Sequence, residues 1–111
     1  MKLPNAGHAI IAEAKLRHYL LSRRHPLGRF KAAFFASLGY TEQDWRRLEA
    51  DLRLQHLSLD VEEQQPTTYG RKFVIAGPLT GPSERTALVA SVWVIRKEED
   101  FPRFVTAYPG S

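Results

Sequence analysis

The sequence predicts an α+β fold, in which three N-terminal helices are followed by a three-stranded antiparallel β-meander and cover one face of its sheet. Apolar residues recur at helical spacing in the first half of the chain and at a spacing of two in the second half. The length of 111 residues suits one modest hydrophobic core, so we expect a single domain over residues 1–111.

Helix signals lie in three segments of the first half. Residues 12–22 combine good helix formers with apolar side chains one turn apart. A second helix is expected over residues 28–38, with Gly39 as its stop signal. Thr41 is expected to cap a third helix, with Asp44 three residues later as a weaker relative of the capping box.

Strand signals occupy the second half of the chain. An acidic and polar connection over residues 58–68 separates them from the helices. Two-residue alternation then predicts strands over residues 69–76, 86–96 and 103–108. The stretch between the first two, residues 77–82, is rich in Gly and Pro and predicts a hairpin with a fairly long loop.

The pattern of the second strand predicts which face of the sheet is buried. Its even-numbered positions from Leu88 to Val94 are all apolar, so we expect them to face the helices. Val105 and Ala107 of the last strand are expected on the same side. The opposite, open face would carry three side chains that can contact a nucleotide: Trp93, Thr106 and Tyr108. High strand propensity explains the same residue types without any ligand.

Positive charge is concentrated in the first half of the chain. The net charge is +4, from 16 Lys and Arg against 12 Asp and Glu. No acidic residue lies between Glu13 and Glu42, a window that contains six cations: Lys15, Arg17, Arg23, Arg24, Arg29 and Lys31. Such a window creates a positive potential that attracts a phosphate-rich ligand. A solvated basic helix face explains the same residues without a ligand.

Composition excludes several classes of function. The chain has no cysteine, which excludes disulfides, thiolate metal sites and a cysteine nucleophile. It contains no apolar run near the ~20 residues of a membrane span and no glycine-rich phosphate loop. Its histidines and acids lack the spacing of metal ligands. We therefore expect no metal, no cofactor, no membrane partner and a location in the cytoplasm.

RNA cleavage is a reaction that needs neither a metal nor a cofactor. Attack of a ribose 2′-hydroxyl on the adjacent phosphate requires a base, an acid and cations around the phosphoryl oxygens. His25 lies at a predicted turn among cations that favour its neutral, base-competent form. Arg24, Arg29 and Lys31 lie close by in sequence as phosphate partners. A turn histidine hydrogen-bonded to the backbone is the alternative for His25.

Several stretches along nearly the whole chain carry a resemblance to a known family. They include MKLPNA at residues 1–6, HPLGRFKA at residues 25–32 and PRFVTAYP at residues 102–109. On these stretches the chain resembles a bacterial family of small single-domain proteins whose function is unassigned. This resemblance implies no particular activity.

A more distant resemblance concerns the order of elements and the last strand. Helices followed by a meander that ends in Arg-x-x-Thr-x-Tyr-Pro resemble the barnase, EndoU, colicin and RelE-like superfamily of metal-independent ribonucleases, many of which are toxin domains. The resemblance implies cleavage of RNA to a 2′,3′-cyclic phosphate. It also implies that His25 and Lys31 form one half of an active site, and Thr106 and Tyr108 the other half.

Two functions remain open from the sequence. The first is a toxin-like ribonuclease, which predicts that its catalytic residues converge in one basic, concave site. Its residues are His25, Lys31, Thr106 and Tyr108 for catalysis, with Arg24, Arg29 and Trp93 for binding RNA. The second is a non-catalytic binding module, namely an antitoxin, an immunity-like protein or an RNA-binding accessory. It predicts an exposed apolar or aromatic patch for a cognate partner. Neither function fixes an oligomeric state.

Overall fold

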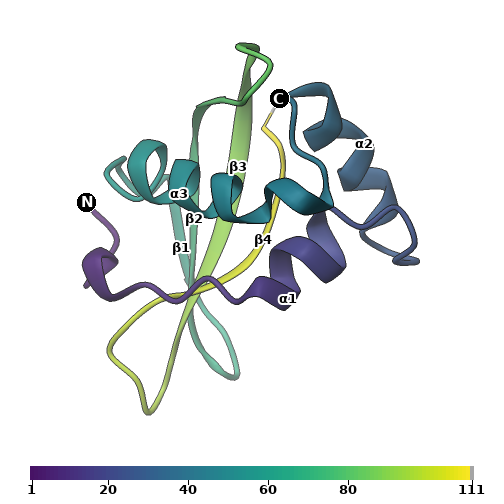
Figure 1. The fold of residues 1–111 in the computed structure, drawn as a ribbon. Coiled ribbons are helices and arrows are strands. Elements are labelled where there is room, and N and C mark those ends of the chain that lie inside the picture. Colours follow the sequence, from purple (N-terminus) through teal and green to yellow (C-terminus); the bar gives the residue numbers. More distant parts are fainter. Residues whose placement is uncertain (111) are drawn as a thin grey trace.

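A computed structural model describes residues 1–110 as a four-stranded antiparallel sheet with helices packed against one face (Figure 1). The strand order is β1-β2-β3-β4, so each strand pairs with its neighbour in sequence. The predicted α+β class and the order of helices before strands are confirmed, whereas the predicted number of strands is wrong. No helix within this described part of the chain is long and apolar enough to cross a membrane.

The first helix differs in form from the prediction. It begins as α1 (Glu13–Lys15) and continues as η2 (Leu16–Leu20), whose wider turn has a bond from the Leu21 N–H to the Leu16 carbonyl. Leu16 and Leu20 are buried in the core, so the predicted apolar face is confirmed. The wider turn belongs to the π-helix class, which is often found at functional sites.

The other two helices follow their local end signals. Helix α2 (Arg29–Ser37) stops before Gly39, which adopts a φ of 101°. A short 3-10 turn, η3 (Glu42–Asp44), leads into α3 (Trp45–Gln55). The capping box is present, because the Asp44 carboxylate accepts a bond from the Thr41 N–H at 2.9 Å and the Thr41 side chain accepts one from the Asp44 N–H.

The central hairpin is tighter than the sequence predicts. Strand β2 (Gly70–Thr80) pairs along its full length with β3 (Thr86–Arg96), so it continues through Gly77 and Pro78. The outer edge of β2 faces α3 at this point, because the Thr80 N–H bonds to the Gln55 side chain. Pro78, two residues earlier, has its ring nitrogen on the same edge of β2. Strand β1 does not extend to this position, so the missing N–H of Pro78 breaks no hydrogen bond between strands.

A fourth strand lies within the stretch that was expected to be a connection. Strand β1 (Glu63–Pro66) pairs with β2, from Glu63 opposite Val74 to Pro66 opposite Arg71. All four residues of β1 are exposed. The segment therefore lacks the alternation of apolar and polar residues by which a half-buried strand is found in a sequence.

The buried face of the sheet is the opposite of the predicted one. Val89, Ser91, Trp93 and Ile95 of β3 face the helices, and Trp93 is 0% exposed, whereas Leu88 is 55% exposed. A bulge between Val92 and Trp93 shifts the pairing of β4 (Arg103–Pro109). As a result, two residues of β4 enter the core, Phe104 and Ala107. Burial of Ala107 was expected; Val105 lies against the other face, beside Val74, Ala90 and Val92.

Buried hydrogen bonds explain why Ser91 belongs to the core. The Trp93 indole N–H donates to Ser91 Oγ at 2.9 Å, and Ser91 Oγ lies 2.8 Å from His56 Nδ1. His56 Nε2 in turn lies 3.2 Å from the Gly77 carbonyl oxygen. Burial lowers the pKa of His56, and this outweighs the opposite effect of its bond to Gly77. His56 is therefore held in its neutral form.

The reversed sheet faces can be tested by two alanine substitutions. Trp93→Ala should lower the free energy of unfolding by about 3–5 kcal/mol, because it leaves a cavity in the core. Leu88→Ala, on the exposed face, should change it by less than about 0.5 kcal/mol. Urea denaturation measures both values. Similar losses for the two variants would contradict the assignment of the faces.

Stability should also depend on pH through His56. The folded state favours neutral His56, whereas the unfolded chain takes up a proton near its ordinary pKa of about 6.5. The stability that neutral His56 contributes to the folded state is therefore fully present above that pH and is lost as the pH falls below it. Urea denaturation between pH 8 and pH 5 should show this loss in the wild type and in His18→Gln, which alters an exposed histidine. A loss of the same size in His56→Gln would assign the effect to other groups.

Candidate functional site

Three polar side chains meet where the helices reach the edge of the sheet. Lys31 Nζ donates hydrogen bonds to Tyr19 Oη and to Thr106 Oγ1, both at 2.9 Å. The two hydroxyl oxygens lie 3.4 Å apart. All three side chains are partly exposed. We call Tyr19, Lys31 and Thr106 the lysine cluster.

Three elements supply the lysine cluster. Tyr19 lies in the wide turn η2, Lys31 in the first turn of α2, and Thr106 on the edge strand β4, which runs beside these helices (Figure 1). Gly28 allows the start of α2 to pack onto η2, because a Cβ at this position would overlap the Tyr19 carbonyl oxygen. Thr106 pairs with Val92, next to the bulge. Its side chain therefore lies on the face of the sheet that no helix covers, which we call the open face.

His25 holds the turn that joins η2 to α2. Its Nδ1 accepts bonds from the Leu27 and Gly28 N–H groups, both at 3.0 Å. Its ring stands edge-on to the Tyr19 ring, with the centroids 5.0 Å apart. This is the backbone-bonded turn histidine that the sequence left as the alternative. In neutral His25 the hydrogen is on Nε2, so the ring is a donor here and its accepting nitrogen is not free to act as a base.

The electrostatics of the lysine cluster favour ionisation of Tyr19. Burial alone would raise the pKa of the Tyr19 phenol. The hydrogen bonds from Lys31 and Thr106, together with the charges of Lys31 and Lys15, more than offset burial and lower that pKa. The cluster therefore makes the Tyr19 phenol easier to ionise than a free tyrosine.

Lys31 has no carboxylate partner among residues 1–110. None of the salt bridges within residues 1–110 includes it. Its two bonds go to the side-chain oxygens of Tyr19 and Thr106, so no carboxylate among the described residues cancels its positive charge. A cation of this kind, partly buried and rigidly held, is suited to bind an anionic group such as a phosphate.

The other predicted site residues lie in different environments. Tyr108 is 37% exposed and lies two residues beyond Thr106 on the same face of β4, without a hydrogen bond to the lysine cluster within the described residues. Arg24 and Arg29 are exposed, and Arg29 lies over the Phe30 ring. Trp93 was expected on the open face but is fully buried, because its large ring fills the core against Phe104, so it has no surface on which to bind a ligand.

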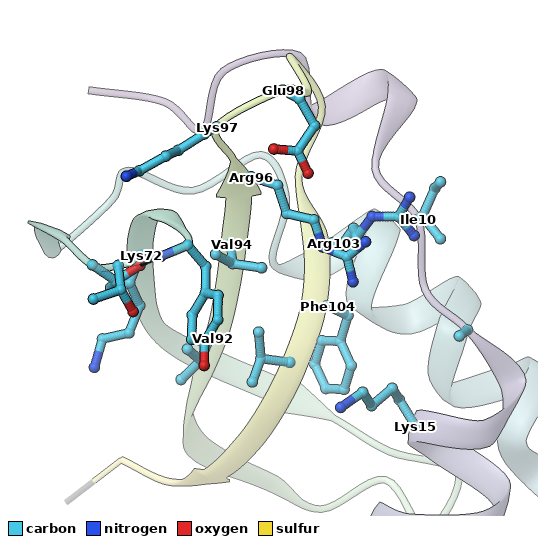
Figure 2. Close-up of a pocket in the computed structure, with 15 residues that line it drawn as sticks. Ile10, Lys15, Lys72, Val92, Val94, Arg96, Lys97, Glu98, Arg103 and Phe104 are labelled. Atoms are coloured by element: carbon cyan, nitrogen blue, oxygen red, sulfur yellow. Dashed lines mark hydrogen bonds between the residues drawn. The ribbon is translucent and has the colours of Figure 1, made fainter.

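A groove of about 840 Å³ lies on the open face of the sheet (Figure 2). Its floor is apolar and includes Val92, Val94 and Val105. Five cationic residues and one acidic residue are among those that line it: Lys15, Lys72, Arg96, Lys97, Arg103 and Glu98. In Figure 2, Lys72 and Lys97 lie on one side of Val94, and Arg103 and Lys15 lie on the other. The groove is therefore strongly cationic, although the positions of these residues in the sequence did not predict it.

The groove continues toward the lysine cluster. Val92 of the groove floor is the pairing partner of Thr106. Lys15 lines the groove, and its charge also acts on Tyr19. A long anion that lies in the groove can therefore present one of its groups to Lys31.

The described residues offer no metal site. Across residues 1–110, no three His, Asp or Glu side chains are close enough together to hold a metal ion. The chemistry available to the lysine cluster is that of an ammonium group, two hydroxyl groups and a neighbouring imidazole.

The sequence matches a known protein family over nearly its whole length. Residues 2–111 match the family described as "Domain of unknown function (DUF6883)". The chain belongs to this family. The expectation of a family without an assigned function is thereby confirmed. No curated protein matches the chain.

A solved structure shares the fold. It is a chain of a contact-dependent growth inhibition toxin–immunity protein complex from Klebsiella pneumoniae 342. It superposes with a TM-score of 0.68 at 18% sequence identity, over 91% of this chain and 99% of that chain. At this level of identity the likeness shows a common fold.

The control of Tyr19 by Lys31 can be measured directly. Lys31→Met should raise the pKa of Tyr19, because it removes both a donor and a positive charge, and Thr106→Val should raise it through the loss of one donor. NMR titration of protein labelled at the tyrosine Cζ carbon follows each phenol. Arg46→Met, which neutralises an exposed cation on α3, is the control. An unchanged Tyr19 pKa in Lys31→Met would contradict the described cluster.

Proposed function

We propose that this protein is a metal-independent, toxin-like ribonuclease that cleaves RNA by attack of a 2′-hydroxyl on the adjacent phosphate. The observation that carries the proposal is the bonding of Lys31, whose ammonium group holds Tyr19 and Thr106 and has no carboxylate partner among the described residues. The cationic groove beside this cluster supports an RNA substrate. An RNA substrate implies action in the cytoplasm.

The proposed reaction uses Tyr19 as base. The ionised phenol oxygen of Tyr19 takes the proton of the 2′-hydroxyl, and the O2′–P bond forms as the P–O5′ bond breaks. The Lys31 ammonium group stabilises the charge on the phosphoryl oxygens and gives a proton to the departing O5′. Proton return from Tyr19 to Lys31 restores both groups. The products are a 2′,3′-cyclic phosphate and a 5′-hydroxyl end.

The remaining residues have supporting roles in this mechanism. Thr106 donates to a phosphoryl oxygen once substrate replaces its present bonds. His25 positions Tyr19 and offers its Nε2–H to the substrate, a role that replaces the base expected from the sequence. Tyr108 lies along the same strand face as Thr106 and is placed to contact an adjoining nucleotide. Arg24 and Arg29 remain proposed contacts to more distant phosphates.

A non-catalytic binding module is the second candidate. The similar structure comes from a complex of a toxin with its immunity protein, which supports a cognate protein partner for this chain as well. Leu27 and Phe30 are large apolar side chains that lie exposed near the start of α2 and suit such a contact. This candidate predicts binding of a toxin or an antitoxin without RNA cleavage.

RNA cleavage in EDTA tests the proposed function. Lys31→Met should lower the cleavage rate by about 10²–10³-fold, because it removes the group that stabilises the phosphoryl charge. Tyr19→Phe should also lower the rate and should remove the rise of the rate with pH that ionisation of the Tyr19 phenol produces. Incubation with total RNA, followed by mass spectrometry of the ends formed on a short substrate, measures rate and product.

The controls separate loss of chemistry from loss of fold. Arg46→Met neutralises a cation remote from the site and should retain wild-type cleavage. Thermal unfolding of each variant shows whether the chain is folded at the assay temperature. Cleavage that persists in Lys31→Met and Tyr19→Phe would reject these roles. Absence of cleavage by the wild-type protein would reject the ribonuclease and favour the binding module.

A further inference from the structure

The open face of the sheet combines two properties that single-stranded nucleic acids require of a binding surface. It carries unneutralised positive charge, and it carries apolar and aromatic surface that bases can cover. The proposed function needs only a phosphate at Lys31 and does not say how the rest of the substrate is held. The groove residues provide that information.

Most of the cationic side chains in the groove have no acidic partner in the part of the chain that the structure describes. Lys15, Lys72 and Lys97 have no salt-bridge partner within residues 1–110. Arg103 is instead held by Glu99 through two hydrogen bonds of 2.8 and 2.9 Å. Three lysines of the groove are therefore available for phosphate groups, while Arg103 mainly stabilises the groove wall.

Tyr69 presents an aromatic ring at the side of the groove. Its side chain is 77% exposed, although the turn that carries it is well ordered by hydrogen bonds. Thr67 Oγ1 accepts bonds from the Tyr69 and Gly70 N–H groups, and the Lys97 N–H bonds to the Tyr69 carbonyl. An aromatic ring that is exposed on a fixed turn is a suitable platform on which a base can stack.

The floor of the groove is also suited to bases. Val94 of β3 and Val105 of β4 are half-buried on the face that no helix covers, and the buried Val92 packs against Val105. A duplex keeps its bases stacked on one another, so it would contact this surface only with its backbone. A single strand can turn its bases onto the valines and Tyr69 while its phosphates meet the lysines.

We propose that this groove binds single-stranded RNA, with bases on Tyr69 and the valine floor and with phosphates at Lys72, Lys97 and Lys15. The bound RNA passes Val92 and Thr106 and so reaches the lysine cluster. The identity of the strand as RNA rests on the proposed function. The expected preference for a single strand over a duplex rests on the groove itself.

Binding is tested with an oligonucleotide that cannot be cleaved. A fluorescein-labelled 2′-O-methyl RNA of about 10 nucleotides, within the usual site size of single-strand binding proteins, lacks the attacking hydroxyl. Fluorescence anisotropy should show that the wild-type protein binds the single strand at least about tenfold more tightly than the duplex of the same sequence. Equal or tighter binding of the duplex, or no binding of either, would overturn the proposal.

Two variants distinguish the base platform from the phosphate contacts. Tyr69→Ala should weaken binding about 5–100-fold through lost stacking and leave the salt dependence unchanged, whereas Tyr69→Phe should bind like the wild type. Lys72→Met should weaken binding and reduce the slope of log K against log salt by about 0.7. Arg46→Met is the matched control and should bind normally. Unchanged binding by Tyr69→Ala would reject RNA in favour of an acidic protein. Displacement of the RNA by polyglutamate, added at the same concentration of negative charges as the RNA, would do the same.

The outcomes separate this inference from the proposed function. Binding of the single strand without cleavage of the unmodified RNA supports the groove and rejects the ribonuclease. Cleavage that is unaffected by Tyr69→Ala and Lys72→Met supports the lysine cluster and rejects the groove.

Discussion

Burial of Trp93 against Phe104 and the helices is the interaction on which the remainder of the molecule depends. The largest side chain of β3 can lie on only one face, and its indole N–H needs a partner there. Ser91 Oγ accepts that bond and is itself bonded to His56. This choice assigns the opposite residues of β3 to the side without helices. The cationic groove exists because that second face is free, so the hydrogen-bonded core determines where a ligand can bind.

The bulge in the pairing of β3 with β4 connects this core to the lysine cluster. Without the extra residue, Phe104 and Thr106 would lie on the same face of β4. With it, Phe104 packs on Trp93, while Thr106 lies on the open face at the edge that Lys31 reaches. Bulges commonly redirect a side chain next to a functional site. Here a single residue, Val105, separates the packing role of the strand from its chemical role.

Local signals predicted the helices well, and contacts distant in sequence explain the errors. Gly39, Thr41 and Asp44 act within a few residues, so the ends of α2 and α3 could be predicted. The reversed sheet faces arose from Ser91, because a serine that is satisfied by a distant histidine cannot be told from a surface serine. Lys31 and Thr106 were predicted as one site from a resemblance. Tyr19 was missed, because its bonds span 12 and 87 residues of sequence and its spacing fits a helix core equally well.

The lysine cluster also ties η2 and α2 to the last strand of the sheet. The same three side chains thus hold the fold together and supply the proposed chemistry. A substitution of any of them therefore affects both the stability and the activity of the protein. The groove lysines and Tyr69 are different, because they lie outside the hydrophobic core and contribute little to its packing. A preference for a different ligand can therefore evolve by substitution of groove residues, while the lysine cluster stays constant.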